Sequence, residues 1–265
     1  MVSQPVHLPS TAELPCSDDI PVDNEDQNLL PNLLLFVLAS LWAERMDWYF
    51  GVDMAIYHTT GASPKVPVVP DGFLSLGVER RKISSEDKGQ TEGRLSYALW
   101  EESGVAPMMV LEMVSKTPGD EYDEKLQIYQ RLGVRYYVVY NPKYWERDRH
   151  LPFELYKLID SPEEKRYQLQ MGEPYWMPEV GLGIGRTRQL FGGIELEMLL
   201  WHDAQGVPYP LPEEALKQMQ VSVKRLQQQL VAEQQRAERA EQQQARLADY
   251  LRSLGIDPNN LPPDK

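Results

Sequence analysis

One stretch, residues 107–142, constrains the fold of this chain more than any other part of the sequence. It contains an apolar run (MMVL), a polar segment rich in turn residues, a helical pattern that ends at Gly133 and a second apolar run (VRYYVVYN). This order predicts a strand, a loop, a helix and a second strand, with the helix joining two parallel strands. A single carboxylate, Glu112, interrupts the first apolar run. Because strands that are buried on both faces are continuous apolar runs, an acid inside one requires a partner or a function.

The segments on either side of this unit predict a helix and further strands. Leucines and valines recur at three- and four-residue steps from about Asp26 to Trp48, which is typical of an amphipathic helix. Alternating or continuous apolar runs predict strands, and polar or Gly- and Pro-rich segments predict connections. In chain order, we expect strands at 49–58 and 66–76, an exposed insertion at 79–93, a strand at 95–102, an antiparallel hairpin of 153–160 with 165–170 at the edge of the sheet, a loop over 172–186 with a turn at 181–185, and either a strand or a helix at 195–203.

The C-terminal region has a different pattern, a heptad repeat. Over 213–254 it predicts a helix about 63 Å long at ~1.5 Å per residue, which is long enough to form a coiled coil with a second copy or with another helical protein. Glu233 and Gln244 fill two places of the repeat, which weakens its centre. The other places hold Leu216, Met219, Val223, Leu226, Leu230, Ala237, Ala240, Leu247, Leu251 and Leu254.

These patterns divide the chain into four regions of different character. We expect a flexible acidic arm (1–25), one α/β domain (26–210), a coiled-coil helix (211–255) and a short tail (256–265). No apolar run approaches the ~18 residues of a membrane span, and the N-terminus lacks the pattern of a signal peptide. The single cysteine excludes an internal disulfide. We therefore expect a cytoplasmic protein without a membrane partner.

The distribution of charge limits the nucleic acids that this chain can bind. The formal net charge is −13, and residues 27–212 alone retain −7. A protein that binds duplex DNA tightly usually has a basic face, so tight nonspecific binding is disfavoured. Any contact with nucleic acid must depend on a local patch such as Arg80-Arg81-Lys82.

Two acids are candidates for a metal site. Asp71 follows Pro70 at a strand interrupted by proline, and Glu112 lies inside VLEMVS. Acids on two neighbouring strands can converge on one cavity, and Mg²⁺ (or Mn²⁺) prefers oxygen ligands such as carboxylates and water. A metal held there would orient a water, lower its pKa and neutralise charge on a phosphodiester. The pair therefore indicates metal-dependent hydrolysis of a phosphodiester.

A lysine close to these acids would stabilise the charge that develops during such a reaction. In a common nuclease arrangement the lysine lies two residues after the second acid, where this chain has Val114. Lys116 keeps the parity of the strand but lies past its expected end. Lys125 lies in the first turns of the following helix, which packs over the strand in a βαβ unit and can direct a long side chain back to Glu112. We favour Lys125 over Lys116.

Structural explanations also exist for each of these residues. An aspartate after proline is a frequent turn former, which would account for Asp71. Glu112 could form a buried ion pair with an arginine, and a helix lysine such as Lys125 is exposed by default. Tyr129 and the Tyr136-Tyr137 pair fit core and sheet packing. The four histidines lack the spacing of metal ligands.

Several motifs occur together in the order found in one known family. They are VPDGFLSLGV, SYALWEES, APMMVLEMVSKTPGDEYDEKLQIYQRLGVRYYVVYNP and YWMPEVGLGIG…GIELEMLLWHDAQG. Over residues 25–204 the chain resembles the Uma-type family of restriction-endonuclease-like proteins, which is abundant in cyanobacteria. The glutamine-rich helix ending in YLRSLGIDPNNLP is similar to that of members with this architecture. The resemblance implies the PD-(D/E)xK nuclease fold, a central mixed sheet flanked by helices, with Asp71 and Glu112 as its acids and Lys125 as a relocated lysine.

Two functions are compatible with these features. In the first, the chain is a Mg²⁺-dependent endonuclease that hydrolyses DNA: Asp71, Glu112 and the backbone carbonyl of Met113 bind the metal, and Lys125 supports the attacking water. DNA binding is then weak or local. In the second, the nuclease fold is a binding or assembly module that forms a homodimer, or pairs with a helical partner, through 213–254. The displaced lysine and the acidic surface favour the second function.

Overall fold

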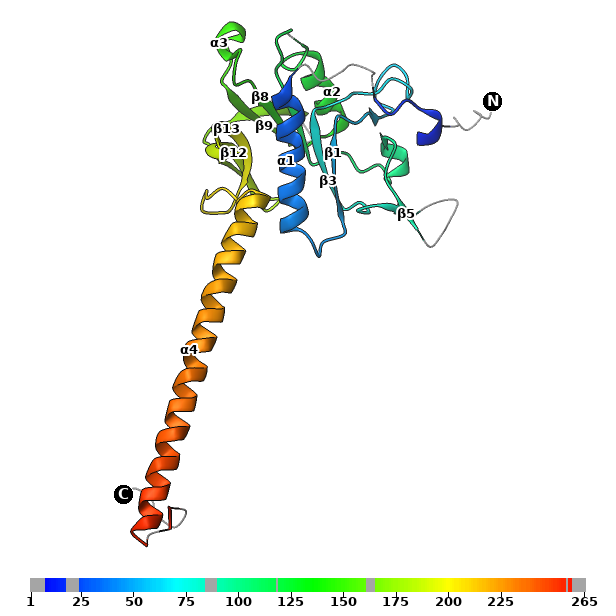
Figure 1. Ribbon diagram of the computed structural model, residues 1–265. Coiled ribbons are helices and arrows are strands. Elements are labelled where there is room, and N and C mark those ends of the chain that lie inside the picture. Colours follow the sequence, from blue (N-terminus) through cyan, green and yellow to red (C-terminus); the bar gives the residue numbers. More distant parts are fainter. Residues whose placement is uncertain are drawn as a thin grey trace. The chain divides into compact units, whose positions relative to one another are not determined.

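The computed structural model describes residues 8–17, 24–83, 90–117, 119–160, 165–255 and 257–258. The chain forms two compact units, Met1–Tyr209 and Pro210–Lys265. The first unit contains all the strands and the short helices, and the second contains one long helix (Figure 1).

The first unit is built on a six-stranded mixed sheet with the order β1-β3-β7-β8-β9-β10. Only β7 and β8 are parallel, and all other neighbours in this sheet are antiparallel. Helix α2 (Glu124–Leu132) connects the parallel pair, so the predicted βαβ unit is confirmed, as is the hairpin at the sheet edge. The strands are β1 (Trp48–Val52), β3 (Gly72–Leu76), β7 (Met109–Met113), β8 (Tyr136–Tyr140), β9 (Phe153–Asp160) and β10 (Lys165–Gln170).

Smaller elements surround this sheet. A second, three-stranded antiparallel sheet has the order β11-β12-β13, β2 pairs with β6 in parallel, and β4 forms a hairpin with β5. Helix α1 (Glu25–Leu41) precedes β1. The remaining bounds are η1 (Thr11–Glu13), β2 (Ile56–Tyr57), β4 (Lys82–Ile83), β5 (Thr91–Glu92), β6 (Tyr97–Ala98), η2 (Leu99–Glu101), α3 (Trp145–Asp148), β11 (Tyr175–Met177), β12 (Leu182–Phe191) and β13 (Ile194–His202).

Several expected elements differ from those in the structure. Helix α1 ends at Leu41 rather than at Trp48. Residues 42–47 are exposed or half-buried, whereas Trp48 is 1 % exposed as the first residue of β1. The predicted strand 95–102 is only β6 followed by a 3₁₀ turn. The predicted loop 172–186 contains β11 and the first part of β12. Segment 195–203 is a strand.

The turn expected at 181–185 is wrong for a specific reason. Gly183 and Gly185 lie inside β12. A Cβ on Gly185 would lie 2.7 Å from the Cα of Pro174, so glycine is required there for close backbone packing rather than for a turn. In a sequence, glycine can indicate either a turn or a close approach of two backbone segments.

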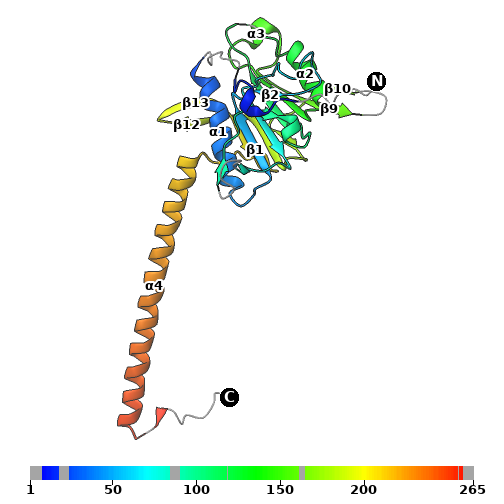
Figure 2. The same cartoon turned by 90° about the vertical axis from the view of Figure 1, so that its right-hand side faces the viewer.

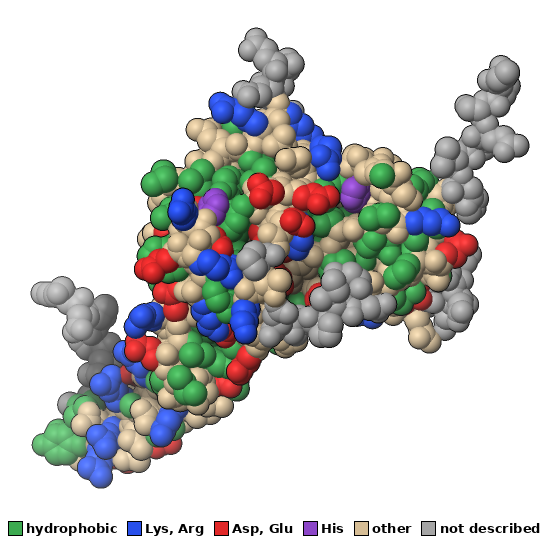
Figure 3. Space-filling view, turned by 90° about the horizontal axis from the view of Figure 1, so that it is seen from above, with side chains coloured by type: hydrophobic (Ala, Val, Ile, Leu, Met, Phe, Trp, Pro, Cys, Tyr) green, Lys and Arg blue, Asp and Glu red, His purple; other side chains and the backbone are tan. Residues whose placement is uncertain are grey.

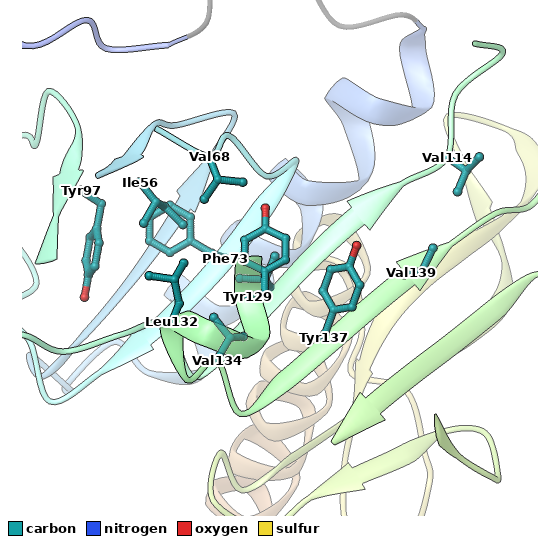
Figure 4. Packing of buried hydrophobic residues seen from close by; sticks show 11 residues of the cluster. Ile56, Val68, Phe73, Tyr97, Val114, Tyr129, Leu132, Val134, Tyr137 and Val139 are labelled. Carbon is teal, nitrogen blue, oxygen red and sulfur yellow. The ribbon is translucent and has the colours of Figure 1, made fainter. Parts of the chain in front are cut away.

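The two faces of the six-stranded sheet are covered by different elements. Helix α1 and the second sheet lie on one face, where Trp201 Nε1 donates a hydrogen bond of 2.9 Å to the carbonyl of Leu34 (Figures 1 and 2). Helix α2 lies on the other face. Its Tyr129 and Leu132 pack against Phe73 and Tyr137 in one buried cluster (Figure 4).

Part of the segment expected to be a flexible arm packs against the first unit. Residues 8–17 are described, and Leu14 among them is 8 % exposed against Ala55, Tyr57 and Ala98. The rest of that segment up to residue 23, most of the expected tail, and residues 84–89 of the expected insertion lie outside the described residues.

The second unit is helix α4 (Pro212–Ser253). The large apolar side chains at its heptad positions are exposed, for example Val223 at 47 % and Leu226 at 63 %. Among the described residues, no helix is long and apolar enough to cross a membrane.

Candidate functional site

The register of the sheet brings the two predicted acids together. Gly72 on β3 pairs with Leu111 on β7, so Asp71, one residue earlier in the antiparallel pair, lies opposite Glu112. Directly opposite residues of a sheet share one face, and this face is the one that α2 covers. Asp71 Oδ2 accepts a hydrogen bond of 2.6 Å from the backbone N–H of Met113. This bond fixes the Asp71 side chain to the strand that carries Glu112. A residue that served only to form a turn would not need such a contact.

Glu112 is almost completely buried, with 1 % of the residue exposed, and both of its carboxylate oxygens accept hydrogen bonds. Lys125 Nζ donates to Oε2 at 2.8 Å, and the Tyr129 hydroxyl donates to Oε1 at 2.6 Å. The two donors are four residues apart in α2, so they lie on the same side of the helix. The expected contact between Lys125 and Glu112 is present, and the ion-pair partner of this buried acid is a lysine rather than an arginine.

The other two positions considered for the lysine lie elsewhere. Val114 is 6 % exposed and belongs to the same buried cluster as Tyr129 and Leu132 (Figure 4), so the usual lysine position is filled by an apolar side chain. Lys116 is exposed, and its backbone carbonyl accepts a hydrogen bond of 2.7 Å from Arg147 Nη1. Of the three positions, only Lys125 has a side chain that contacts the Glu112 carboxylate.

The site contains two carboxyl groups but only one lysine, and this imbalance shifts the pKa values of all three groups. Burial, followed by the charge of Glu112, raises the pKa of Asp71 to about 8, against the opposing effects of the Met113 N–H and Lys125. Burial also raises the pKa of Glu112 despite its contacts with Lys125 and Tyr129. Burial alone would lower the pKa of Lys125, but the contact with Glu112 and the charge of Asp71 outweigh it and raise that pKa. A buried acid, Glu112, and a half-buried one, Asp71, thus lie near a single cation, Lys125.

Two residues of this site were not identified as functional from the sequence. From the sequence, Tyr129 fits core packing, although its position four residues after Lys125 places it on the same helix face. Gln27, 9 % exposed on α1, donates from Nε2 to the Met113 carbonyl at 3.2 Å. No local sequence signal distinguishes Gln27, because the contact joins residues 86 positions apart.

The donor set fits a hard divalent cation. Asp71 Oδ1 accepts no hydrogen bond from the part of the chain that the structure describes, and it lies beside a second carboxylate that repels it. The Met113 carbonyl, which accepts one bond from Gln27, has a second lone pair. The described residues contain no group of three or more His, Cys, Asp or Glu side chains that could hold a metal. A site with two carboxylates suits Mg²⁺, which keeps several of its waters.

A pocket of about 540 Å³ is lined in part by Lys125, although neither Asp71 nor Glu112 is among its lining residues. Lys125 is part of its lining, so the pocket begins at the residue that contacts Glu112. Its volume is within the ~300–1,000 Å³ of typical small-ligand pockets. The site therefore combines two neighbouring acids, a lysine paired with one of them, and a space for a ligand that adjoins the lysine.

Comparison with known proteins assigns this region to a family. Residues 20–149 match the family model Uma2, which is described as "Putative restriction endonuclease", and they include Asp71, Glu112 and Lys125. No curated protein and no solved structure matches the chain. The central mixed sheet with helices on both faces is a restriction-endonuclease-like fold. Through residues 20–149, this chain belongs to the Uma2 family.

Proposed function

We propose that the first unit is a Mg²⁺-dependent (or Mn²⁺-dependent) endonuclease that hydrolyses DNA phosphodiester bonds. The observation that carries this proposal is the buried arrangement of Asp71 beside Glu112 with Lys125 2.8 Å from the second acid. Two neighbouring acids that share one lysine resist being ionised together, which is why the pKa values of both are raised, and a divalent cation would favour the ionised form of both. Membership of a family described as restriction endonucleases is in agreement with this chemistry.

In the proposed mechanism, the protein residues hold the reacting groups in place. Asp71 and Glu112 bind the metal, together with the Met113 carbonyl that Gln27 positions. When bound, Mg²⁺ lowers the pKa of a water and neutralises charge on the scissile phosphate. Lys125 stays protonated and presents an N–H group to the attacking water and the phosphate. Tyr129 holds Glu112 in one orientation through Oε1, which leaves Oε2 facing Lys125.

The surface charge favours weak or local binding of DNA. On the face drawn in Figure 3, basic and acidic side chains are interspersed rather than gathered into one basic surface. Within the patch at 80–82, Arg80 packs over the ring of Trp48 at 4.0 Å, and Lys82 forms an ion pair with Glu102 at 2.7 Å. Only Arg81 of this patch is fully exposed, so we expect the patch to add little to affinity.

Replacing the two candidate lysines separately tests the assignment of Lys125. We expect Lys125→Met to lower the rate of Mg²⁺-dependent nicking of a supercoiled plasmid by about 10²- to 10³-fold, because methionine keeps the unbranched stem but removes the charge. The matched variant Lys116→Met should nick at the wild-type rate. If Lys116→Met loses activity and Lys125→Met keeps it, the lysine of the reaction is Lys116.

A second candidate function is assembly through α4. The observation that favours it is the row of exposed apolar side chains along a 42-residue helix. Such a helix gains most of its stability by packing its apolar face against a partner. The heptad spacing is that of a coiled coil, and we propose a second copy of this chain as the partner.

Light scattering on the full chain tests this assembly. We expect a mass of twice 30.5 kDa, that is, a dimer. Val223→Glu, inside the repeat, should weaken the dimer at least about tenfold by removing a buried side chain and opposing two charges. Val221→Glu makes the same change two residues away, outside the repeat, and should leave the dimer intact. A monomeric wild-type chain, or equal effects of the two variants, would exclude the proposed coiled coil.

A further inference from the structure

The pocket beside Lys125 has one wall outside the region that matches the family. Residues 20–149 match the family model, but Pro15 and Ser17 also line the pocket. The rest of the lining includes Lys65 and Val66 and, on α2, Lys125 and the half-buried Ile128. The N-terminal segment thus contributes two lining residues from outside the matched region.

Specific contacts hold this N-terminal wall in place. The Tyr57 hydroxyl donates to the carbonyl of Pro15 at 2.8 Å, and the backbone N–H of Ala55 donates to the carbonyl of Cys16 at 3.1 Å. Farther along, Trp100 Nε1 donates to the carbonyl of Pro9 at 2.9 Å. These bonds connect the segment to β2 and η2, so the wall is anchored at both ends of the described stretch.

The lining of the pocket suits a single nucleobase with its phosphate. Much of it is apolar, contributed by the valines and proline that precede Asp71 and by Ile128. Lys65 and Lys125 provide two cations, and Asp120 and Glu124 provide two acids, so the pocket carries no excess of positive charge. An apolar wall favours the face of a base, and a lysine favours the phosphate attached to it. The balanced charge disfavours the long phosphate contacts that a duplex requires.

A base that remains paired and stacked in a duplex cannot enter such a pocket. Enzymes that take a base into a pocket act on single strands or extrude the base from the helix, at a cost in unstacking. The net charge of the chain is −13, so its overall electrostatic attraction for DNA does little to offset that cost. An unpaired strand, or a frayed end, presents its base without this cost.

We propose that the pocket formed by Pro15, Ser17, Val66 and Ile128 beside Lys125 receives an unpaired nucleotide next to the scissile phosphate, so that single-stranded or frayed DNA is the preferred substrate. This inference rests on the proposed nuclease function of Asp71 and Glu112. In this proposal the N-terminal segment closes the substrate pocket, and Val66 and Lys65 contact the bound nucleotide.

The single cysteine of the chain provides a direct test. Cys16 is exposed and lies between the two N-terminal wall residues. The probe is the rate at which iodoacetamide alkylates Cys16 in the full-length chain, with Ca²⁺ in place of Mg²⁺ because Ca²⁺ binds oxygen ligands with looser geometry. A short single-stranded thymidylate oligonucleotide should slow alkylation about fivefold or more. A blunt-ended hairpin duplex of equal nucleotide content should not. Equal protection by both, or by neither, would overturn the proposal.

A pair of valine variants provides an independent measurement. Val66 is 61 % exposed at the pocket, and Val207 is 56 % exposed away from it, so glutamate at either position should leave the fold intact. Val66→Glu should weaken the affinity for a fluorescently labelled single-stranded thymidylate oligonucleotide about tenfold, because it places an acid against the nucleotide. Val207→Glu should bind as the wild type does. Equal affinities of the two variants would contradict the proposed pocket.

The outcomes separate this inference from the function on which it rests. If single and duplex DNA are cut equally and the Asp71 and Glu112 variants are inactive, the nuclease function holds and the inference fails. If single strands protect Cys16 but Mg²⁺ supports no cleavage, the pocket holds and the nuclease function fails.

Discussion

Replacing Glu112 with glutamine is expected to reduce Mg²⁺-dependent DNA cleavage by about a thousandfold or more, because the metal loses a charged ligand whose effect is worth several kcal/mol in the transition state. Glutamine has nearly the same shape and keeps an acceptor for the Tyr129 hydroxyl, so the chain should remain folded. The measurement is the initial rate of plasmid nicking, with circular dichroism as the check on folding.

A second buried glutamate provides the matched control. Glu154 on β9 is 4 % exposed, and it lies in the same cross-strand row as Glu112, because both pair with Val139 of the strand between them. Glu154 accepts hydrogen bonds from Tyr156 and Leu151 rather than from α2. Glu154→Gln should therefore keep its cleavage activity. Cleavage that survives in Glu112→Gln at the wild-type rate would remove Glu112 from the active site.

The second large effect is a gain of stability when Asp71 is replaced with asparagine. At about pH 8.5 and without divalent cations, Asp71→Asn should be about 1–3 kcal/mol more stable than the wild type, the usual range for relieving a buried group that lacks compensation. Asparagine keeps an acceptor for the Met113 N–H but cannot carry the charge that Glu112 repels. Urea unfolding of the two proteins measures the difference.

The pH dependence of this difference has a definite sign. Burial and the charge of Glu112 raise the folded-state pKa of Asp71 to about 8, from an ordinary value of 3.8. Between these two values the folded protein holds a proton that the unfolded chain releases, so the stability of the wild type falls as pH rises through this window. Asp71→Asn has no such carboxyl. The gap between the proteins should open from about pH 4 to about pH 8 and stay constant above it.

Mg²⁺ should close this gap if Asp71 binds it. A cation that binds only the folded protein stabilises it in proportion to the logarithm of its concentration. We therefore expect Mg²⁺ to stabilise the wild type at about pH 8.5 and to leave Asp71→Asn unchanged. If the difference in unfolding free energy between the two proteins depends on neither pH nor Mg²⁺, the Asp71 carboxyl neither destabilises the fold when ionised nor binds the metal.

The sequence predicted those parts of the fold that depend on local patterns. The βαβ unit at 107–142 and the hairpin of β9 with β10 follow from apolar runs separated by turn residues, because periodicity reflects which side chains must be buried. The same local logic failed at Gly183 and Gly185. There the glycines allow Pro174 to pack closely, and that contact is distant enough in the sequence to leave no pattern.

In the candidate site, too, some features follow from local sequence patterns and others depend on distant contacts. A buried carboxylate at Glu112 and the displacement of the lysine from Val114 can be read directly from the sequence, because each involves one residue type inside a recognisable strand. The direction of the Lys125 side chain could be anticipated, since a crossover helix packs on the strand that precedes it. The roles of Tyr129 and Gln27 could not, because each depends on which atom of a distant residue lies within hydrogen-bonding distance.

The sequence by itself determined that this chain contains a buried acid, a helix that follows it and a long heptad helix. Those properties depend on neighbours within one or two turns of the chain, and hydrophobic burial imposes them locally. Only the tertiary structure decided that Asp71 lies opposite Glu112, that Lys125 forms an ion pair with Glu112, and that Pro15 and Ser17 line the same pocket as Lys125. These depend on strand register and on contacts between distant segments, which are set by the packing of the whole unit and not by any single stretch.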